Sequence, residues 1–205
     1  MQLTLTDIGK KFNRQWVFKG INLTIHPNQS IALVGNNGSG KSTLLQIIFN
    51  YQTYSKGEIV YSLNQAILTE NELVGKIAIA APYIDLLEDF TLLEMLHFHF
   101  SLIPKKNDIS LQEMIIDSGL SLQEHKAIKF FSSGMKQRLK LVLAIYADTP
   151  LLLLDEPCSN LDNQGIDWYR KLIQSQLTHR TIIIASNQLL EYDFCDRTVS
   201  ILDFK

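Results

Sequence analysis

The stretch SIALVGNNGSGKSTLLQIIFN, Ser30 to Asn50, decides the fold of this chain. Its first five residues are typical of a buried strand, and its last ten have the spacing of an apolar helix. Between them, Gly35 to Ser42 satisfy the pattern G-x-x-x-x-G-K-[ST], the phosphate-binding P-loop. Glycines let the backbone bend so that successive N–H groups converge on phosphate oxygens, and the helix amino terminus adds a partial positive charge. A strand, a phosphate-binding loop and a helix are therefore predicted in direct succession.

The P-loop residues are expected to share the contacts with a bound nucleotide. Lys41 should reach the β- and γ-phosphates, the hydroxyl of Ser42 should bind magnesium, and Thr43 is placed to touch the α-phosphate. The remaining cradle residues are Gly35, Asn36, Asn37, Gly38, Ser39 and Gly40. The alternative interpretation is a flexible glycine loop, which would not require a strand before it and a helix after it.

A second apolar run, LLLLDEP, ends in two carboxylates. Asp155 can hold a magnesium ion through water, and Glu156 can orient or deprotonate an attacking water. Adjacent carboxylates after an apolar run are common by themselves. Together with the P-loop and its Lys41, they predict a site that hydrolyses a nucleotide.

The rest of the sequence predicts an α/β core at both ends of the chain and a helical segment between them. Alternation typical of half-exposed strands covers residues 1–12, 20–25 and 56–63, and short apolar runs typical of central parallel strands cover 151–155 and 181–185. Helical spacing covers residues 91–102, 111–120, 134–147 and 163–177. We therefore expect one domain over 1–205, with a core in 1–82 and 148–205 and a helical subdomain in 83–147.

Composition limits the class of protein. The 205 residues fit one or two small domains, and a net charge of -2 with 20% charged residues does not indicate a nucleic-acid binder. No window has the roughly 18 consecutive apolar residues of a membrane span, and the amino terminus lacks the layout of a signal peptide. Cys158 and Cys195 are too few for a disulfide framework or zinc site. A reduced, cytoplasmic setting is the simplest inference.

With these motifs in place, the chain resembles the ATP-binding subunits of ABC transporters over nearly its whole length. Residues 131–138, FSSGMKQR, are similar to the family signature L-S-G-G-Q, and residues 159–162, SNLD, match the family's D-loop. The order of P-loop, helical insertion, signature, carboxylates and D-loop is specific to this family. The resemblance implies a P-loop NTPase core with a parallel sheet, an N-terminal antiparallel β subdomain and an inserted α-helical subdomain.

The signature segment matches the family in part. Ser132 and Gly134 agree with it, whereas Ser133 replaces a glycine and Met135 replaces the glutamine. The resemblance implies that the two serines and the glycine contact the γ-phosphate of a nucleotide held by the opposite subunit. It also places Asp162 of the D-loop among the nucleotide-binding residues. ATP would then join two head-to-tail subunits, and hydrolysis would release them.

An aromatic residue near the amino terminus is expected to stack on adenine. Phe12, in IGKKFN, occupies the place of the family's stacking aromatic. Trp16 lies close in sequence and competes for the same role. The alternative for Phe12 is an aromatic residue buried at the end of a strand.

The chain departs from the family where a histidine usually contacts the γ-phosphate. Asn187 stands there, directly after the strand TIIIA, while His179 lies before that strand. An amide can donate a hydrogen bond to phosphate but cannot take up or release a proton near neutral pH. The alternative is that Asn187 merely forms the turn at the end of the strand.

A second departure concerns the metal site. Pro82 aligns with a glutamine that usually binds magnesium, and a shift of one residue would put Tyr83 there; neither is a good magnesium ligand. Either the metal keeps an extra water or Asp85 assists. Hydrolysis is still expected, because the P-loop lysine and serine and both carboxylates are present.

The resemblance implies a motor subunit that binds ATP and Mg²⁺, hydrolyses ATP and drives a membrane transporter. Its partners would be a second copy or a homologous ATPase subunit, and separate integral-membrane subunits at the cytoplasmic face of the cell membrane. The end at Lys205 favours an exporter-like system, since some importer ATPases carry a further regulatory domain. One alternative is a soluble ABC ATPase acting on nucleic acid or the ribosome, although nucleic acid is not expected as a partner. The other is a weakly hydrolysing regulatory subunit, motivated by Asn187 and Pro82.

Overall fold

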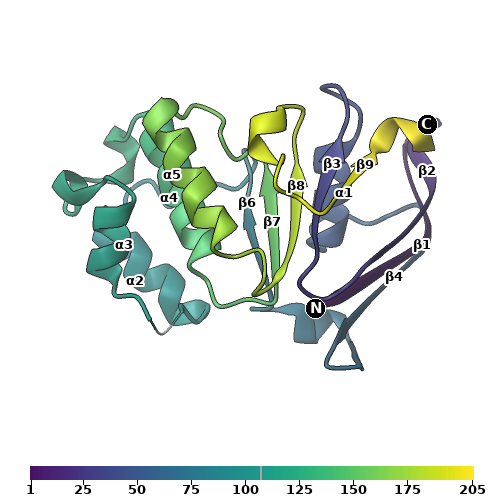
Figure 1. Cartoon of the computed structure of the whole chain (residues 1–205), viewed down its shortest axis with the longest axis horizontal. Coiled ribbons are helices and arrows are strands. Elements are labelled where there is room, and N and C mark those ends of the chain that lie inside the picture. The colour runs from purple at the N-terminus through teal and green to yellow at the C-terminus, as the bar shows by residue number, and fades with distance from the viewer. Residues whose placement is uncertain (107) are drawn as a thin grey trace.

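Two β-sheets form the framework of the protein, whose computed structural model describes residues 1–106 and 108–205 (Figure 1). The parallel sheet has the strand order β6-β7-β8-β3-β9. Its strands are β3 (Ser30–Val34), β6 (Ile77–Ala80), β7 (Leu151–Asp155), β8 (Thr181–Ala185) and β9 (Arg197–Ser200). The antiparallel sheet has the order β2-β1-β4-β5. Its strands are β1 (Gln2–Phe12), β2 (Gln15–Ile25), β4 (Lys56–Leu63) and β5 (Ala66–Leu68).

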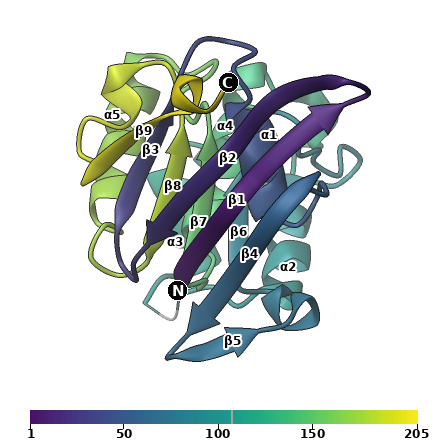
Figure 2. The same ribbon diagram turned by 90° about the vertical axis from the view of Figure 1, so that its right-hand side faces the viewer.

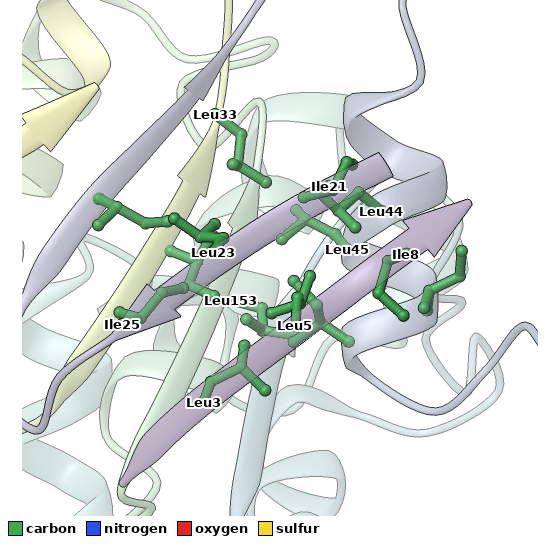
Figure 3. Packing of buried hydrophobic residues seen from close by; sticks show 14 of the residues in the cluster. Leu3, Leu5, Ile8, Ile21, Leu23, Ile25, Leu33, Leu44, Leu45 and Leu153 are labelled. Atoms are coloured by element: carbon green, nitrogen blue, oxygen red, sulfur yellow. The ribbon is translucent and has the colours of Figure 1, made fainter. Parts of the chain in front are cut away.

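Helix α1 (Lys41–Ile48) lies between the two sheets. Figure 2 shows the antiparallel sheet lying in front of the parallel one, with α1 behind it. Apolar residues of both sheets and of α1 join in one core, which Figure 3 shows from close by. Leu44 and Leu45 of α1 are completely buried in this core. The helix that begins at the P-loop is therefore packed on more than one side.

Two helices cover the other face of the parallel sheet, α4 (Ser133–Ile145) and α5 (Asn163–Gln174). Helices α2 (Leu92–Leu102) and α3 (Leu111–Asp117) pack with α4 at the end of the molecule away from the antiparallel sheet (Figure 1). Short 3₁₀ helices cover Glu70–Leu73, Ser121–Gln123, Ile128–Phe130, Leu189–Glu191 and Ile201–Phe204. No helix in the described part of the chain is both long enough and apolar enough to cross a membrane.

The arrangement confirms the predicted fold class: a parallel α/β core with an antiparallel β part and inserted helices. The division at residues 82/83 and 147/148 stays a prediction. Strand β2 begins at Gln15, five residues before its predicted start, because it pairs with β1 along most of its length. The short strands β5, β6 and β9 were not predicted. Strands β6 and β9 form the two edges of the parallel sheet and have only four residues each, too few for a clear pattern.

Candidate functional site

All strands of the central sheet run parallel, so their carboxyl ends lie at one edge, where ligands bind in open α/β sheets. Strand β8 lies between β3 and β7. The P-loop follows β3, Glu156 follows β7 and Ser186 follows β8. A cavity of about 330 Å³ opens here. Its walls are Phe12, Val17, Asn37, Gly38, Ser39, Gly40, Lys41, Ser42, Thr43 and Glu156. The structure thus brings most of the predicted P-loop residues, the aromatic residue and the second carboxylate to one place.

Glycine is required at the end of the P-loop. Gly40 has φ +108° and is the residue before the first turn of α1. A Cβ atom there would lie 2.7 Å from Cγ1 of Val17 on β2, closer than side-chain atoms normally approach. Only glycine combines this backbone angle with this space. Strand β2 of the antiparallel sheet therefore packs directly against Gly40 and leaves no room for a larger residue there.

Lys41 is buried, and its ammonium group is bonded inside the loop. Its Nζ donates hydrogen bonds to the carbonyl oxygens of Gly35 at 2.7 Å and Asn36 at 3.2 Å. Gly35 and Asn36 do not line the cavity. Their backbone carbonyls hold the ammonium group of Lys41 in place. Lys41 also lines the cavity, so its ammonium group could meet an anionic ligand bound there.

Asp155 is almost completely buried, and neither carboxylate oxygen has a hydrogen-bond partner among the described residues. Burial raises the pKa of Asp155 to about 6; the nearby Ser42 hydroxyl lowers it, Glu156 raises it and Lys41 lowers it. Ser42 lies close but does not meet the geometry of a hydrogen bond to either oxygen. A buried carboxylate without donors is a natural oxygen ligand for a cation. Asp155 and Ser42 therefore fit the predicted magnesium ion, which when bound would supply charge stabilisation to phosphate oxygens.

Glu156 has a left-handed backbone conformation, φ +47°, uncommon for a residue with a side chain. Its N–H donates to the carbonyl of Ala185 on β8 at 2.9 Å, so the turn is held against the neighbouring strand. The side chain lines the P-loop cavity. A strained backbone conformation persists only where the surroundings enforce it, as the bond to Ala185 does here.

Two residues that sequence reasoning missed hold the loop after Glu156. The carboxylate of Glu191, wholly buried, accepts a hydrogen bond from the N–H of Cys158 at 2.8 Å. The side-chain amide of Gln137 on α4 donates to the carbonyl of Pro157, also at 2.8 Å. The sequence offers no local signal for either residue, because Gln137 lies between Lys136 and Arg138 and nothing beside Glu191 marks its carboxylate as buried.

Asn187 lies at the carboxyl end of β8, exposed and turned toward the P-loop. Its Nδ2 donates a hydrogen bond to Oδ1 of Asn37 at 3.0 Å, and Asn37 lines the cavity. His179 lies before β8 and lines a different cavity, beside Lys106 and Gln176. The structure therefore places the asparagine, and not the histidine, next to the phosphate-binding loop.

The two aromatic candidates for adenine stacking take different positions. Phe12 ends β1, is 48% exposed and lines the P-loop cavity. The Nζ of Lys10 lies 4.9 Å from the centre of its ring and donates to the carbonyl of Thr53. Trp16 does not line the cavity, and the Nζ of Lys11 lies 5.5 Å from its ring. Of the two, Phe12 alone is placed for the predicted contact.

The signature and the D-loop form a second cavity, also of about 330 Å³. Its walls are Ser132, Ser133, Gly134, Met135, Arg138, Asn160, Leu161 and Asp162. The hydroxyl of Ser132 accepts a hydrogen bond from the N–H of Met135 and caps α4. A Cβ atom on Gly134 would lie 2.8 Å from the carbonyl oxygen of Asn160, so glycine permits the close approach of signature and D-loop. The two cavities have no lining residue in common.

Asp162 is bonded within its own chain. Its Oδ1 accepts from the N–H of Gly165 at 2.8 Å, which caps α5, and from Nη2 of Arg138 on α4 at 3.0 Å. These bonds tie the D-loop to the signature helix. Direct contact of Asp162 with a nucleotide stays a prediction.

Pro82 and Tyr83, the two residues that could stand at the place of the family's glutamine, differ in their surroundings in the segment after β6. Pro82 is exposed, and its carbonyl accepts a hydrogen bond from Nζ of Lys140 on α4 at 3.2 Å. Tyr83 turns inward, and its hydroxyl oxygen is buried. Asp85 is exposed, and its charge acts on Lys140. Tyr83 is therefore the residue of this segment that approaches the site.

Comparison with known proteins identifies the family. Residues 18–159 match the family model described as ABC transporter. The chain belongs to the ABC transporter family. The matched region includes the P-loop, the signature and both carboxylates, whereas Phe12, Asp162 and Asn187 lie outside it. The chain is accordingly an ABC ATPase domain.

Similar proteins agree with this identification. The Bacillus subtilis YcbN, an uncharacterized ABC transporter ATP-binding protein, is 31% identical over 202 residues, covering 98% of this chain and 64% of YcbN. The Escherichia coli D-allose import ATP-binding protein AlsA is 30% identical over 210 residues, covering 95% of this chain and 41% of AlsA. The domain thus spans less than two thirds of the length of these relatives. A solved structure of the ATP-binding subunit of an ABC transporter has the same fold, with a TM-score of 0.85, 24% identity, and coverage of 98% of this chain and 85% of that one.

Proposed function

We propose that this ABC ATPase domain binds ATP with magnesium, hydrolyses the ATP and drives a membrane transporter through ATP-dependent pairing with a second ATPase subunit. One observation supports the proposal: the predicted P-loop residues and the predicted signature residues line two separate cavities of the same chain. The P-loop cavity is lined by Lys41, Ser42 and Glu156, whereas the signature cavity is lined by the first turn of α4 and has no lysine among its lining residues. Two chains arranged head-to-tail would complete two sites.

The signature cavity is suited to contact the γ-phosphate of a nucleotide that is bound to the P-loop of a second chain. The thirteen-residue helix α4 begins there, and the amino terminus of a helix carries a partial positive charge and unpaired N–H groups. Small residues, Ser132 to Gly134, let a phosphate approach the backbone. This chemistry supports the role that the family resemblance gives to the segment.

In and beside the P-loop cavity, each residue would have its own role in hydrolysis. Lys41 would exchange its carbonyl partners for phosphate oxygens, which bind an ammonium more strongly because they are charged. Ser42 and Asp155 would hold the magnesium ion. Glu156, held in its strained turn, would orient the attacking water and accept its proton. Asn187 would give an uncharged N–H to the γ-phosphate.

The proposed partners are integral-membrane subunits, and the proposed location is the cytoplasmic face of the cell membrane. Family membership supports this arrangement. The proposed direction is export: one similar protein, CcmA of Reclinomonas americana, is named a cytochrome c biogenesis ATP-binding export protein, whereas AlsA is named for import. Movement of substrate in each direction across vesicles that contain the assembled transporter tests this part separately.

ATP-dependent dimerisation is the experiment for the proposal. Glu156→Gln keeps the P-loop but removes the base, so ATP with magnesium should convert the variant from monomer to dimer in light scattering. Lys41→Ala should nearly abolish ATP binding and therefore dimerisation, while the exposed Lys19→Ala serves as the matched control. A Glu156→Gln variant that stays monomeric with saturating ATP, both alone and with its membrane partner, would contradict the proposed pairing.

A weakly hydrolysing regulatory subunit is the second candidate, and one observation favours it. The amide of Asn187 is already bonded to Asn37 and cannot exchange a proton. This candidate predicts tight ATP binding with turnover that remains very slow in the assembled transporter. Single-turnover hydrolysis by that assembly distinguishes the two.

A further inference from the structure

Tyr83 occupies a place beside Asp155 that follows from the pairing of two strands. Strand β6 pairs in parallel with β7, with Ala80 opposite Leu154. The chain after Ala80 therefore leaves the sheet next to Asp155, the last residue of β7. The hydrogen bond from Lys140 to the Pro82 carbonyl holds the outer side of this turn, and the Ile84 N–H closes it on the carbonyl of Ala81 at 3.2 Å.

The hydroxyl of Tyr83 is buried and has no hydrogen-bond partner among the described residues. Burial, and after it the charge of Asp155, raises the pKa of the Tyr83 phenol, so the two groups lie within electrostatic reach. Both oxygens of Asp155 likewise lack partners in the described part of the chain. Two buried polar groups, each without a partner among the described residues, thus lie near each other where β6 and β7 end.

The ring of Tyr83 has a fixed neighbour. It stacks on the ring of Tyr51, with centroids 6.4 Å apart and planes inclined by 19°. Tyr51 lies just after α1, the helix that begins with Lys41 and Ser42. The ring is thereby supported from the carboxyl end of α1, and the hydroxyl is the part of the side chain that needs a hydrogen bond.

An unpaired buried hydroxyl destabilises a folded protein, since the group has lost water and gained nothing in return. Such groups are few in native proteins, and each calls for an explanation by a bound water, ion or function. Magnesium in proteins keeps several of its waters and is usually held by only one or two carboxylates. Water bound to the cation would donate hydrogen bonds to the hydroxyl oxygen of Tyr83 and to the carboxylate of Asp155.

We propose that Tyr83 is a positioning residue for the magnesium ion, its hydroxyl oxygen accepting a hydrogen bond from a water of the ion beside Asp155. The inference rests on the proposed function, because it requires magnesium at Asp155 and Ser42. It assigns to a phenol the role of orienting the hydration of the ion without binding the metal itself. The competing explanation is that Tyr83 only fills space against Tyr51.

Tyr83→Phe tests the proposal, because it keeps the ring and its stacking and removes only the hydroxyl. The magnesium concentration for half-maximal ATP-dependent thermal stabilisation should rise about two- to tenfold, the effect of one lost hydrogen bond. The same shift should appear in the magnesium dependence of turnover. Without nucleotide and magnesium, the melting temperature of Tyr83→Phe should equal or exceed that of wild type, because an unsatisfied buried group is gone. Tyr51→Phe, which removes an exposed hydroxyl from the stacked partner, is the matched control and should change neither quantity.

The outcomes separate this inference from the proposed function. If wild type binds and hydrolyses ATP and Tyr83→Phe has the same magnesium dependence, the role of Tyr83 is wrong and the proposed function stands. A lower melting temperature of nucleotide-free Tyr83→Phe would show that the hydroxyl is bonded inside the fold, which also overturns the inference. If wild type fails to bind ATP with magnesium, the proposed function itself is wrong.

Discussion

The side-chain amide of Asn187 donates a hydrogen bond of 3.0 Å to the side-chain oxygen of Asn37, although 150 residues separate them in the chain. The adjacency of β3 and β8 makes this contact possible, since the segments after the two strands leave the sheet side by side. A residue that follows β8 is therefore in direct contact with the P-loop.

Asn187→Ala should slow ATP hydrolysis about tenfold to a hundredfold while weakening ATP binding much less. One lost hydrogen bond to a charged group corresponds to about 1.5–3 kcal/mol, felt here in the transition state. Single-turnover rates and equilibrium ATP affinity measure the two effects, with the exposed neighbour Gln188→Ala as control. Asn187→His should retain or raise activity and add a pH dependence near the imidazole pKa. Unchanged turnover of Asn187→Ala in the assembled transporter would leave the residue as a simple turn former.

Phe12→Ala should weaken ATP binding, because a base stacked on an aromatic ring loses about 1–3 kcal/mol on removal of that ring, roughly a five- to hundredfold change in affinity. Trp16→Ala should leave the affinity unchanged, since its ring does not line the P-loop cavity. Titration with ATP at fixed magnesium compares the two variants. Loss of affinity in Trp16→Ala alone would reverse the assignment.

Gly134→Ala should destabilise the domain, because its Cβ would lie 2.8 Å from the carbonyl oxygen of Asn160. Overpacking of this kind costs about 1–3 kcal/mol, and for a chain of this size lowers the melting temperature by roughly 2–12 °C. Differential scanning calorimetry measures the change. Ser133→Ala, at the adjacent exposed position, should leave the melting temperature as in wild type. A stable Gly134→Ala variant would mean that the D-loop moves away at no cost.

The pH dependence of stability should include a contribution from His99 on α2. Burial lowers the pKa of His99, and its hydrogen bond with the carbonyl of Leu143 at 3.1 Å acts in the opposite direction. As the pH falls through the ordinary histidine pKa of about 6.5, the unfolded chain takes up the proton first, so the free energy of unfolding decreases. His99→Gln keeps a donor for Leu143 and should flatten this decrease between about pH 7 and pH 5.

Urea unfolding at several pH values gives the free energy of unfolding of each variant, and the slope of this free energy against pH is then compared with that of wild type. His97→Gln, which removes an exposed imidazole from the same helix, provides the reference. Equal slopes for wild type and His99→Gln would contradict the assigned environment of His99.

Local signals in the sequence account for the parts of the site that were predicted. The P-loop is one continuous segment, so its strand, loop and helix could be located without knowledge of the fold. Asp155 and Glu156 follow a continuous apolar run, and the predicted strand at 151–155 is present as β7. For these residues, the neighbouring residues in the sequence are enough to indicate the local structure.

Contacts between distant segments account for the rest. Nothing beside Glu191 in the sequence shows that its carboxylate meets the N–H of Cys158, and the same holds for Gln137 and Pro157. The choice between Pro82 and Tyr83 depended on β6, a four-residue strand whose position at the edge of the sheet comes only from its pairing with β7. Sequence spacing cannot supply such pairings, because they are set by tertiary structure.

The position of α1 between the two sheets has a thermodynamic consequence for nucleotide exchange. A phosphate cradle joined at one end to β3 and at the other to a buried helix is already ordered before any ligand arrives. Binding then has little conformational entropy to overcome, because the residues that meet the phosphates do not have to be immobilised first. Exchange of one nucleotide for another would accordingly need no refolding of the loop, and the enthalpy of binding would come mainly from phosphate contacts, including those that Lys41 forms in place of its bonds to Gly35 and Asn36.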